Sequence, residues 1–375
     1  MLAPVRAARE ATRAVRAYGA ATREHSGTPL VRQWRWTWWL AYHFDIPAET
    51  TYRFRMFRRD QVTPFPRFLH WHDAATLFRF VASRAARKQA ETLADKRLFA
   101  AWCAAEELPT APILASFEGG RMTGGSLLEG KEPQMDLFAK WGTRYGGDDT
   151  SRWRWTGEGY VDDAGRSWQL REILTQLAER SRTGVVLLQP RLVNHPEIRR
   201  LSPGALSTIR VMTTRDPSGA ARFLAGVLRM GTGAATADNF AQGGIASPVD
   251  ASNGIAGPAR RVDEFYRTHV FESHPDTGVP ITGATVPLWN DAIRLALAAH
   301  DLLGPIACVG WDVAVLEDGP VLLEGNWNPC TKLLQVATQT PLLSTDFTST
   351  FDAWLDSPEC GIASERAGDA DDWSP

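Results

Sequence analysis

One acidic and two amide side chains alternate along the segment LLEGNWNPC, residues 322–330. If this segment is a β-strand, Glu324 and Asn326 lie on the same face, because side chains alternate between the two faces of a strand. The preceding residues GWDVAVLEDGP predict the partner strand of a hairpin, since their apolar residues alternate up to an Asp-Gly turn. A three-residue turn at 317–319 would set Asp312 opposite Glu324, whereas a two-residue turn would place Asp312 on the other face.

A divalent cation would explain why two acids should face each other on such a hairpin. Opposed carboxylates repel each other unless a cation lies between them. Oxygen ligands that include one or two carboxylates suit Mg²⁺, which completes its shell with substrate phosphates. Asp312, Glu324 and Asn326 are therefore the candidate metal ligands. A polar strand end that makes only turn hydrogen bonds is the alternative interpretation of the hairpin taken alone.

Two lysines and a glycine-containing loop lie upstream of the hairpin. Lys96 stands at the start of a predicted helix in ETLADKRLFAAW. Lys140 ends a predicted strand in DLFAKW, and the loop that follows contains Gly142, Gly146 and Gly147. Each lysine alone could be an ordinary surface residue. Together with the downstream carboxylates, these residues would form a polyphosphate cradle with its metal.

The hydrophobic pattern predicts the elements that position these residues. Residues 1 to about 95 carry apolar side chains at helical spacing. From about residue 109, short apolar runs alternate with glycine-rich turns and one strongly helical segment, SWQLREILTQLAERSR, which is typical of an α+β lobe. The segments LSTIRVMTT and ARFLAGVLRMG, separated by RDPSG, predict an antiparallel hairpin that carries Arg210 and Arg229.

The order of these motifs resembles the ATP-grasp superfamily over about residues 90 to 335. The strings QPRLVNHPEIRRLSPGALSTIRVMT, ADNFAQGGIASPVD and LLEGN look like the sugar-transfer-associated ATP-grasp group. The strings TIRV, DNFAQGG and GWDVAV…LLEGNWNP are also similar to those of the ribosomal-protein glutamate ligases. The resemblance implies an α+β fold in which two lobes hold ATP, preceded by a helical N-terminal region. The domains implied are a helical region at 1–90, a small lobe at 91–188, a catalytic lobe at 189–356 and a disordered acidic tail at 357–375.

The resemblance also implies which residues contact the nucleotide and the metal. Lysines would meet the phosphates, residues 142–147 would form a lid, and LLQPRL would be the hinge strand that reads adenine. The nearest acid for the ribose is Glu197. The implied ATP contacts are Lys96, Lys140, Gly142, Gly146, Gly147, Gln189, Arg191, Leu192, Glu197 and Asn239. Asp312, Glu324 and Asn326 would hold Mg²⁺, with two ions expected and Mn²⁺ as a substitute.

Arg210 and Arg229 are the candidate catalytic residues. In similar ligases the corresponding arginines meet the transferred phosphoryl group and the substrate carboxylate. The physical reason is general: a carboxylate that attacks the γ-phosphorus brings like charges together, and arginine with Mg²⁺ offsets that repulsion. A general base for a hydroxyl substrate is not evident beside the metal ligands, and the one further acid that could serve, Asp238, is expected to lie remote from them.

The resemblance favours an ATP-dependent carboxylate–amine ligase that acts through an acyl phosphate on a small carboxylic acid and an amine. A kinase that phosphorylates a sugar or another hydroxyl is the first alternative, and a non-catalytic nucleotide-binding module is the second. Other catalytic patterns are absent from the sequence, which contains no G-x-S-x-G, no G-x-x-x-x-G-K-[ST] and no H-E-x-x-H.

The composition of the chain sets our expectations for its partners and its localisation. The net charge is −2, but residues 1–100 carry 18 basic and 8 acidic residues, which indicates either a solvated helical surface or a face for an anionic partner. The Arg-rich N-terminus is compatible with a transit peptide or, as we prefer, an amphipathic helix. The four cysteines are widely spaced and suit a reducing cytosol, and no apolar run reaches a membrane span. We therefore expect a cytoplasmic protein without nucleic-acid or membrane partners.

Overall fold

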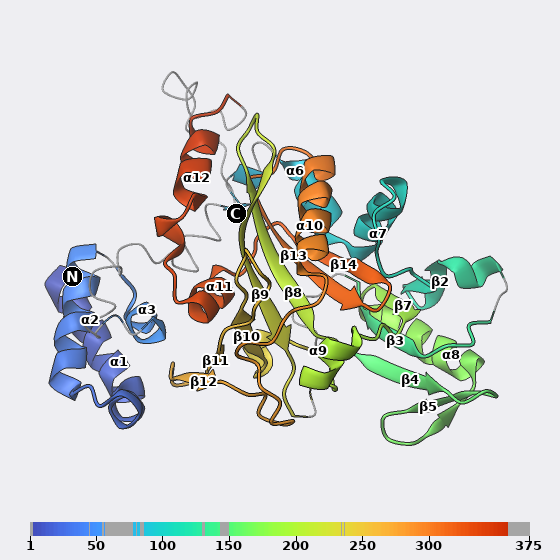
Figure 1. The fold of residues 1–375 in the computed structure, drawn as a ribbon, viewed down its shortest axis with the longest axis horizontal. Helices are drawn as coiled ribbons and strands as arrows, with labels where there is room; N and C mark the ends of the chain where they lie inside the picture. The colour runs from blue at the N-terminus through green and yellow to red at the C-terminus, as the bar shows by residue number, and fades with distance from the viewer. Residues whose placement is uncertain are drawn as a thin grey trace.

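The structure, a computed structural model, describes most of the chain. The described residues are 3–44, 46–54, 56, 78–79, 81–82, 86–129, 132–142, 150–233, 235 and 237–358. Gly146 and Gly147 of the predicted lid, and nearly all of the predicted acidic tail, lie outside these ranges. Within them, the strands form two seven-stranded antiparallel sheets, and Figure 1 shows helices α1 to α3 grouped at the opposite end of the molecule from strands β4 and β5.

The first sheet has the strand order β2-β1-β7-β3-β4-β5-β6. Its strands are β1 (Ala115–Glu118), β2 (Arg121–Gly124), β3 (Leu137–Trp141), β4 (Ser151–Trp155), β5 (Tyr160–Asp162), β6 (Ser167–Trp168) and β7 (Val186–Pro190). Helix α8 (Leu170–Arg180) packs Ile173 and Leu177 against Phe117, Leu137 and Trp153 of this sheet. Strand β7 lies between β1 and β3 and is buried up to Gln189, as expected for the apolar run VVLL at residues 185–188.

The second sheet has the order β12-β11-β10-β9-β8-β13-β14. Its strands are β8 (Thr208–Arg215), β9 (Ala221–Met230), β10 (Ile245–Pro248), β11 (Ala259–Val262), β12 (Thr268–Phe271), β13 (Cys308–Leu316) and β14 (Gly319–Asn326). Helix α10 (Trp289–Leu303) covers one face, where Val211 and Trp311 are buried. Helices α11 (Thr331–Thr338) and α12 (Phe347–Leu355) pack on the other face against Met212. Arg210 lies two residues before Met212 in β8 and pairs with Asp312, so both belong to this second face, where both are buried.

The described parts of the N-terminal region are helical, as predicted. Its helices are α1 (Ala3–Ser26), α2 (Leu30–Phe44), α3 (Ala48–Arg53) and α6 (Arg87–Ala94), and α7 (Lys96–Ala105) follows. Asp95 is extended between α6 and α7, and its carboxylate accepts a hydrogen bond from the backbone N–H of Arg97 at 2.8 Å, which caps α7. His25 Nε2 bonds the carbonyl of Thr268 at 2.9 Å and so ties α1 to the edge of the second sheet.

The remaining helices are short. They are α9 (Pro196–Leu201) and the 3-10 turns η2 (Ser126–Glu129), η3 (Ser181–Thr183), η4 (Phe240–Gln242) and η5 (Leu342–Ser344). None of the described helices has the length and apolar character that a membrane span requires. The α+β class is confirmed by the two sheets and their helices. The four domain boundaries remain predictions.

Candidate functional site

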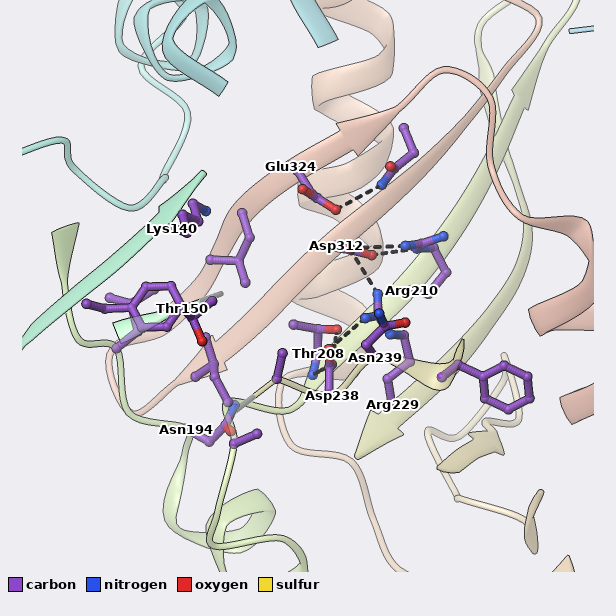
Figure 2. A pocket seen from close by; sticks show the side chains of 18 of the residues that line it. Lys140, Thr150, Asn194, Thr208, Arg210, Arg229, Asp238, Asn239, Asp312 and Glu324 are labelled. Atoms are coloured by element: carbon purple, nitrogen blue, oxygen red, sulfur yellow. Dashed lines mark hydrogen bonds and ion pairs between the residues drawn. The ribbon is translucent and has the colours of Figure 1, made fainter. Parts of the chain in front are cut away.

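A cavity of about 860 Å³ is lined by residues of both sheets. Lys140 and Gln189 line it from the first sheet, whereas Arg210 and Arg229 line it from the second. Figure 2 shows Lys140, Thr150 and Asn194 on one side of this cavity and the two arginines on the other. The structure thus brings together side chains from two sheets, and Lys140 and Arg229 lie 89 residues apart in the sequence.

Asp312 faces Glu324 across β13 and β14, as the sequence predicts, but for a different reason. The turn contains two residues rather than three, because Leu316 pairs with Gly319. A two-residue turn alone would put Asp312 on the wrong face. The register shifts between Val313 and Asp312, where Leu323 is an additional residue in β14, and this bulge restores the facing pair. The predicted three-residue turn is therefore wrong, while the predicted pairing is confirmed.

Asp312 is bonded by both candidate catalytic arginines (Figure 2). Arg210 donates from Nε to Oδ1 at 2.5 Å and from Nη2 to Oδ2 at 3.1 Å, and Arg229 donates from Nη1 to Oδ2 at 3.0 Å. Burial alone would raise the pKa of Asp312, but the charges of Arg210 and Arg229 outweigh it and hold this pKa well below its usual value. Asp312 is therefore ionised and orients two guanidinium groups.

Strand register explains why the arginines converge. Arg210 pairs directly with Asp312 across β8 and β13. Thr208, two residues before Arg210 and therefore on the same face, pairs with Arg229 across β8 and β9. Three neighbouring strands thus direct one carboxylate and two guanidinium groups to one place.

Asp238 belongs to this cluster. The expectation that it lies remote from the candidate metal ligands is therefore wrong. Its carboxylate accepts from Arg229 Nη2 at 2.6 Å, and from the backbone N–H and hydroxyl of Thr208 at 2.9 and 2.5 Å. Burial raises the pKa of Asp238, although the charge of Arg229 opposes this shift. A Cβ on Gly244 would lie 2.9 Å from the carbonyl oxygens of Asp238 and Asn239, so glycine is required for this close backbone approach. The string DNFAQGG, which begins with Asp238, was the available signal for this residue.

The two lysines enter the cavity beside Glu324. The backbone N–H of Lys96 donates to the carbonyl of Gly142 at 3.2 Å, so the start of α7 lies against the end of β3. The ammonium group of Lys96 lies 3.4 Å from the Glu324 carboxylate. Burial and the charge of Lys96 lower the pKa of Lys140 to about 8, although Glu324 and Asp312 oppose this shift. Both lysines thus bring positive charge into the cavity beside Glu324.

The C-terminal end of β14, with Glu324 and Asn326, provides oxygen atoms that could bind a metal ion. Among the described residues, no three His, Cys, Asp or Glu side chains gather as a metal site, so a cation here would also need amide oxygens. Asn326 donates from Nδ2 to the carbonyl of Gly310 at 3.2 Å and to the carboxylate of Glu324 at 3.4 Å. The side-chain oxygen of Asn326 can therefore bind another partner. Asn328 Oδ1 is buried in the cavity wall without a hydrogen-bond partner among the described residues. This set of hard oxygen donors fits Mg²⁺ or Mn²⁺.

The structure brings the predicted adenine-binding residues to the cavity but not the predicted ribose-binding acid. Gln189 is buried on β7, lines the cavity, and donates from Nε2 to the carbonyl of Ala111 at 3.0 Å. Arg191 and Leu192 follow it in the cavity wall. Glu197 is not among the lining residues. Its exposed side chain, in the first turn of α9, pairs with Arg200 at 3.2 Å, so the structure does not bring this ribose candidate to the site.

Asn239, the remaining candidate, lines the cavity, and its side chain accepts from the backbone N–H of Ala241 at 3.0 Å. Of the loop glycines, Gly142 donates its N–H to the carbonyl of Val185 at 2.8 Å, beside β7. Sequence reasoning did not single out Thr208, Arg79 or Lys332, although all three line the same cavity.

The chain was compared with known proteins and families. A family model described as sugar-transfer associated ATP-grasp matches residues 78–349. No curated protein matches the sequence. Similar solved structures include D-alanine–D-alanine ligase from Bacillus anthracis, with 12% identity, a TM-score of 0.41 and coverage of 76% of this chain and 72% of that chain.

Two further structures are similar. One is the ADP complex of N5-carboxyaminoimidazole ribonucleotide synthetase, with 11% identity, a TM-score of 0.38 and coverage of 64% of this chain and 46% of that one. The other is L-amino acid ligase from Bacillus licheniformis, with 11% identity, a TM-score of 0.37 and coverage of 70% and 50%. The chain spans half or less of the length of these two proteins. Such distant likeness concerns the fold alone.

Proposed function

The chain belongs to the sugar-transfer associated ATP-grasp family, and on that premise we propose that it is an ATP-dependent carboxylate–amine ligase. ATP would phosphorylate a small carboxylic acid, and an amine would then displace phosphate from the acyl phosphate to form an amide. No covalent bond to the enzyme is required.

The observation that carries this proposal is the sharing of Asp312 by two buried arginines. An acyl phosphate forms only when a carboxylate approaches the negatively charged γ-phosphate, so the site must concentrate positive charge at that point. Arg210 and Arg229 supply two permanently charged groups, and Asp312 fixes their orientation through three hydrogen bonds. Arginine also presents a planar fork that matches a carboxylate, which a lysine lacks.

The nucleotide would occupy the side of the cavity formed by β3 and β7. Lys96 and Lys140 would contact its phosphates, and the wall from Gln189 to Leu192 would contact its base. Asp312, Glu324 and Asn326 would hold Mg²⁺, and when bound this ion would neutralise the phosphates and the charge that develops during phosphoryl transfer. The carboxylate of Glu324 also keeps the Lys96 ammonium group in place.

One observation favours a kinase as the second candidate. A kinase needs a base for its hydroxyl substrate, and Asp238 is a buried acid within the arginine cluster. However, its carboxylate already accepts three hydrogen bonds, two from Thr208 and one from Arg229, which suits an orienting role better than proton abstraction.

Product analysis tests the proposal. The protein is incubated with ATP, Mg²⁺ and mixtures of carboxylic acids, amines and sugars, and the products are identified by mass spectrometry. ADP together with an amide supports the ligase, and hydroxylamine in place of the amine should trap a hydroxamate. ADP together with a sugar phosphate would establish the kinase instead. No ATP consumption with any mixture would contradict both enzymatic candidates.

A further inference from the structure

One buried polar atom in the wall of the cavity lacks a partner in the described part of the chain. It is the side-chain oxygen of Asn328, which accepts no hydrogen bond from any described residue although Asn328 lines the cavity. A buried amide oxygen without a partner costs free energy, so this atom is available to a bound ligand. An amide oxygen binds either a hydrogen-bond donor or a cation.

The neighbours of Asn328 show where it lies. A Cβ on Gly310 would lie 2.8 Å from Cβ of Pro329, and 3.3 and 3.6 Å from Cδ and Nη1 of Arg210. Pro329 and the Arg210 guanidinium group therefore both lie over Gly310. Residues 310 and 312 of β13 share one face of the sheet, which is the face that carries Asp312. Asn328, joined directly to Pro329, is thus placed beside Arg210 and close to the acid that orients it.

The charges around Asn328 favour a neutral donor over a cation. Arg210 keeps its charge at every physiological pH. Lys332, four residues after Asn328, lines the same cavity, where the described lining residues include nine basic and four acidic side chains. A metal ion beside Arg210 would be repelled, whereas a neutral N–H group would not. A neutral hydrogen-bond donor therefore fits the Asn328 oxygen best.

The amine is the substrate that supplies such a donor in the proposed reaction. The phosphates of ATP and the carboxylate of the acid present acceptor oxygens where they meet. The amine must be neutral to attack, because a protonated nitrogen has no free electron pair. The cavity favours neutral amines, as Lys140 shows: burial and the charge of Lys96 lower the pKa of Lys140 to about 8. A neutral amine retains N–H groups that can donate to an amide oxygen.

We propose that Asn328 binds the amine substrate by accepting a hydrogen bond from the attacking nitrogen, beside Arg210. This inference rests on the proposed function and assigns the subsite of its second substrate. The nitrogen forms a bond to the acyl carbon, and the bond from that carbon to the phosphate oxygen breaks. Phosphate leaves with the bonding electrons and takes up the proton that the nitrogen releases. A neutral amide suits this role, because a carboxylate would hold the amine as an unreactive ammonium ion.

Hydroxamate formation tests the subsite, with hydroxylamine as the amine. The assay contains ATP, Mg²⁺ and the carboxylic acid that product analysis selects. Asn328→Leu, which is similar in volume but lacks the oxygen, should raise the KM for hydroxylamine roughly tenfold, on the scale of one hydrogen bond. The KM for the acid should not change. Asn290→Leu, which replaces an exposed asparagine near the start of α10, is the matched control and should behave as the wild type. Equal KM values for hydroxylamine in Asn328→Leu and the wild type overturn the subsite.

The first half of the reaction shows whether Asn328→Leu remains intact. Without an amine, transfer of the γ-phosphoryl group to the acid and back moves an oxygen-isotope label from the β–γ bridge of ATP to a non-bridging position. This exchange should proceed at the wild-type rate in Asn328→Leu, and its loss would overturn an assignment to the amine. The affinity for Mn²⁺, measured by electron paramagnetic resonance with AMP-PNP present, should also be unchanged. Weaker Mn²⁺ binding would assign Asn328 to the metal instead.

Asn328→Asp tests the requirement for a neutral acceptor. It keeps an oxygen but adds a negative charge, which stabilises the protonated form of hydroxylamine. The pH dependence of hydroxamate formation should therefore shift upward by about one unit. An unshifted profile overturns the contact, because a charge beside the bound amine must change its protonation. If the wild type forms no hydroxamate with any acid, the proposed function and this inference both fail. Hydroxamate formation that is unaltered in Asn328→Leu removes the inference alone.

Discussion

Asp312 faces Glu324 across β13 and β14, although the two residues of the intervening turn would by themselves set them on opposite faces. The additional residue Leu323 restores the pairing. In this sequence, the additional residue in β14 therefore compensates for the short turn.

Deleting Leu323 should retain ATP turnover. Without the bulge, a continuous ladder from the turn pairs Val313 with Leu322 and then Asp312 with Glu324, so Glu324 and Asn326 stay on the face of Asp312. Leu323→Ala keeps the bulge and should also retain turnover. ADP release is measured for both variants, with circular dichroism to verify folding. A folded deletion variant without activity would show that the bulge itself is required, and not only the facing pair.

Glu324→Gln should lower turnover by roughly a hundredfold or more, on the scale of losing one charge-stabilising group, and should leave the fold intact. The Glu324 side chain is partly exposed and contacts Lys96, Asn326 and Asp312. Asp312→Asn should also lose turnover but should be less stable, by about 3–5 kcal/mol, because it leaves the buried Arg210 without its acid and Arg229 with Asp238 alone. Chemical denaturation measures the difference. Wild-type rates in both variants at saturating Mg²⁺ would refute the metal assignment.

ATP affinity should fall as the pH rises above about 8, the lowered pKa of Lys140. Below that pH the Lys140 side chain is charged and can pair with phosphate, whereas above it the free protein holds the neutral amine, so binding must add a proton. The loss should reach at most about tenfold per pH unit. Lys140→Arg stays charged and should show a flat profile between pH 7 and 9. Calorimetry across this range measures both proteins, and an identical slope in both would remove Lys140 from the phosphate site.

Arg229→Lys should raise the KM for the acid substrate and lower kcat, with little change in ATP affinity. Arg229 spans Asp312 and Asp238 with separate nitrogens, and a lysine cannot keep that fork. The loss of a charge-assisted hydrogen bond, about 1.5–3 kcal/mol, corresponds to roughly ten- to a hundredfold in kcat/KM. Arg210→Lys should mainly lower kcat.

Asp238→Asn is the companion variant that separates ligase from kinase. As an orienting residue for Arg229, Asp238 should be partly replaceable by asparagine, which can still accept hydrogen bonds. A kinase that uses Asp238 as its base should lose nearly all activity. A normal Arg229→Lys protein together with an inactive Asp238→Asn protein would therefore favour the kinase.

The sequence by itself determined the local features of this site. Alternation predicted the strands that carry Arg210, Arg229 and Glu324, and a helix start and a strand end predicted the positions of Lys96 and Lys140. The order of the motifs indicated the family that the family model matches. These features follow from neighbouring residues, because strand and helix periodicity are local properties.

Only the tertiary structure decided what those elements bring together. It added the bulge at Leu323, placed Asp238 against Arg229, and turned Glu197 to solvent. Strand register, loop closure and helix packing are set by contacts between distant segments, and their energies depend on which side chains are buried together rather than on the pattern of any one segment.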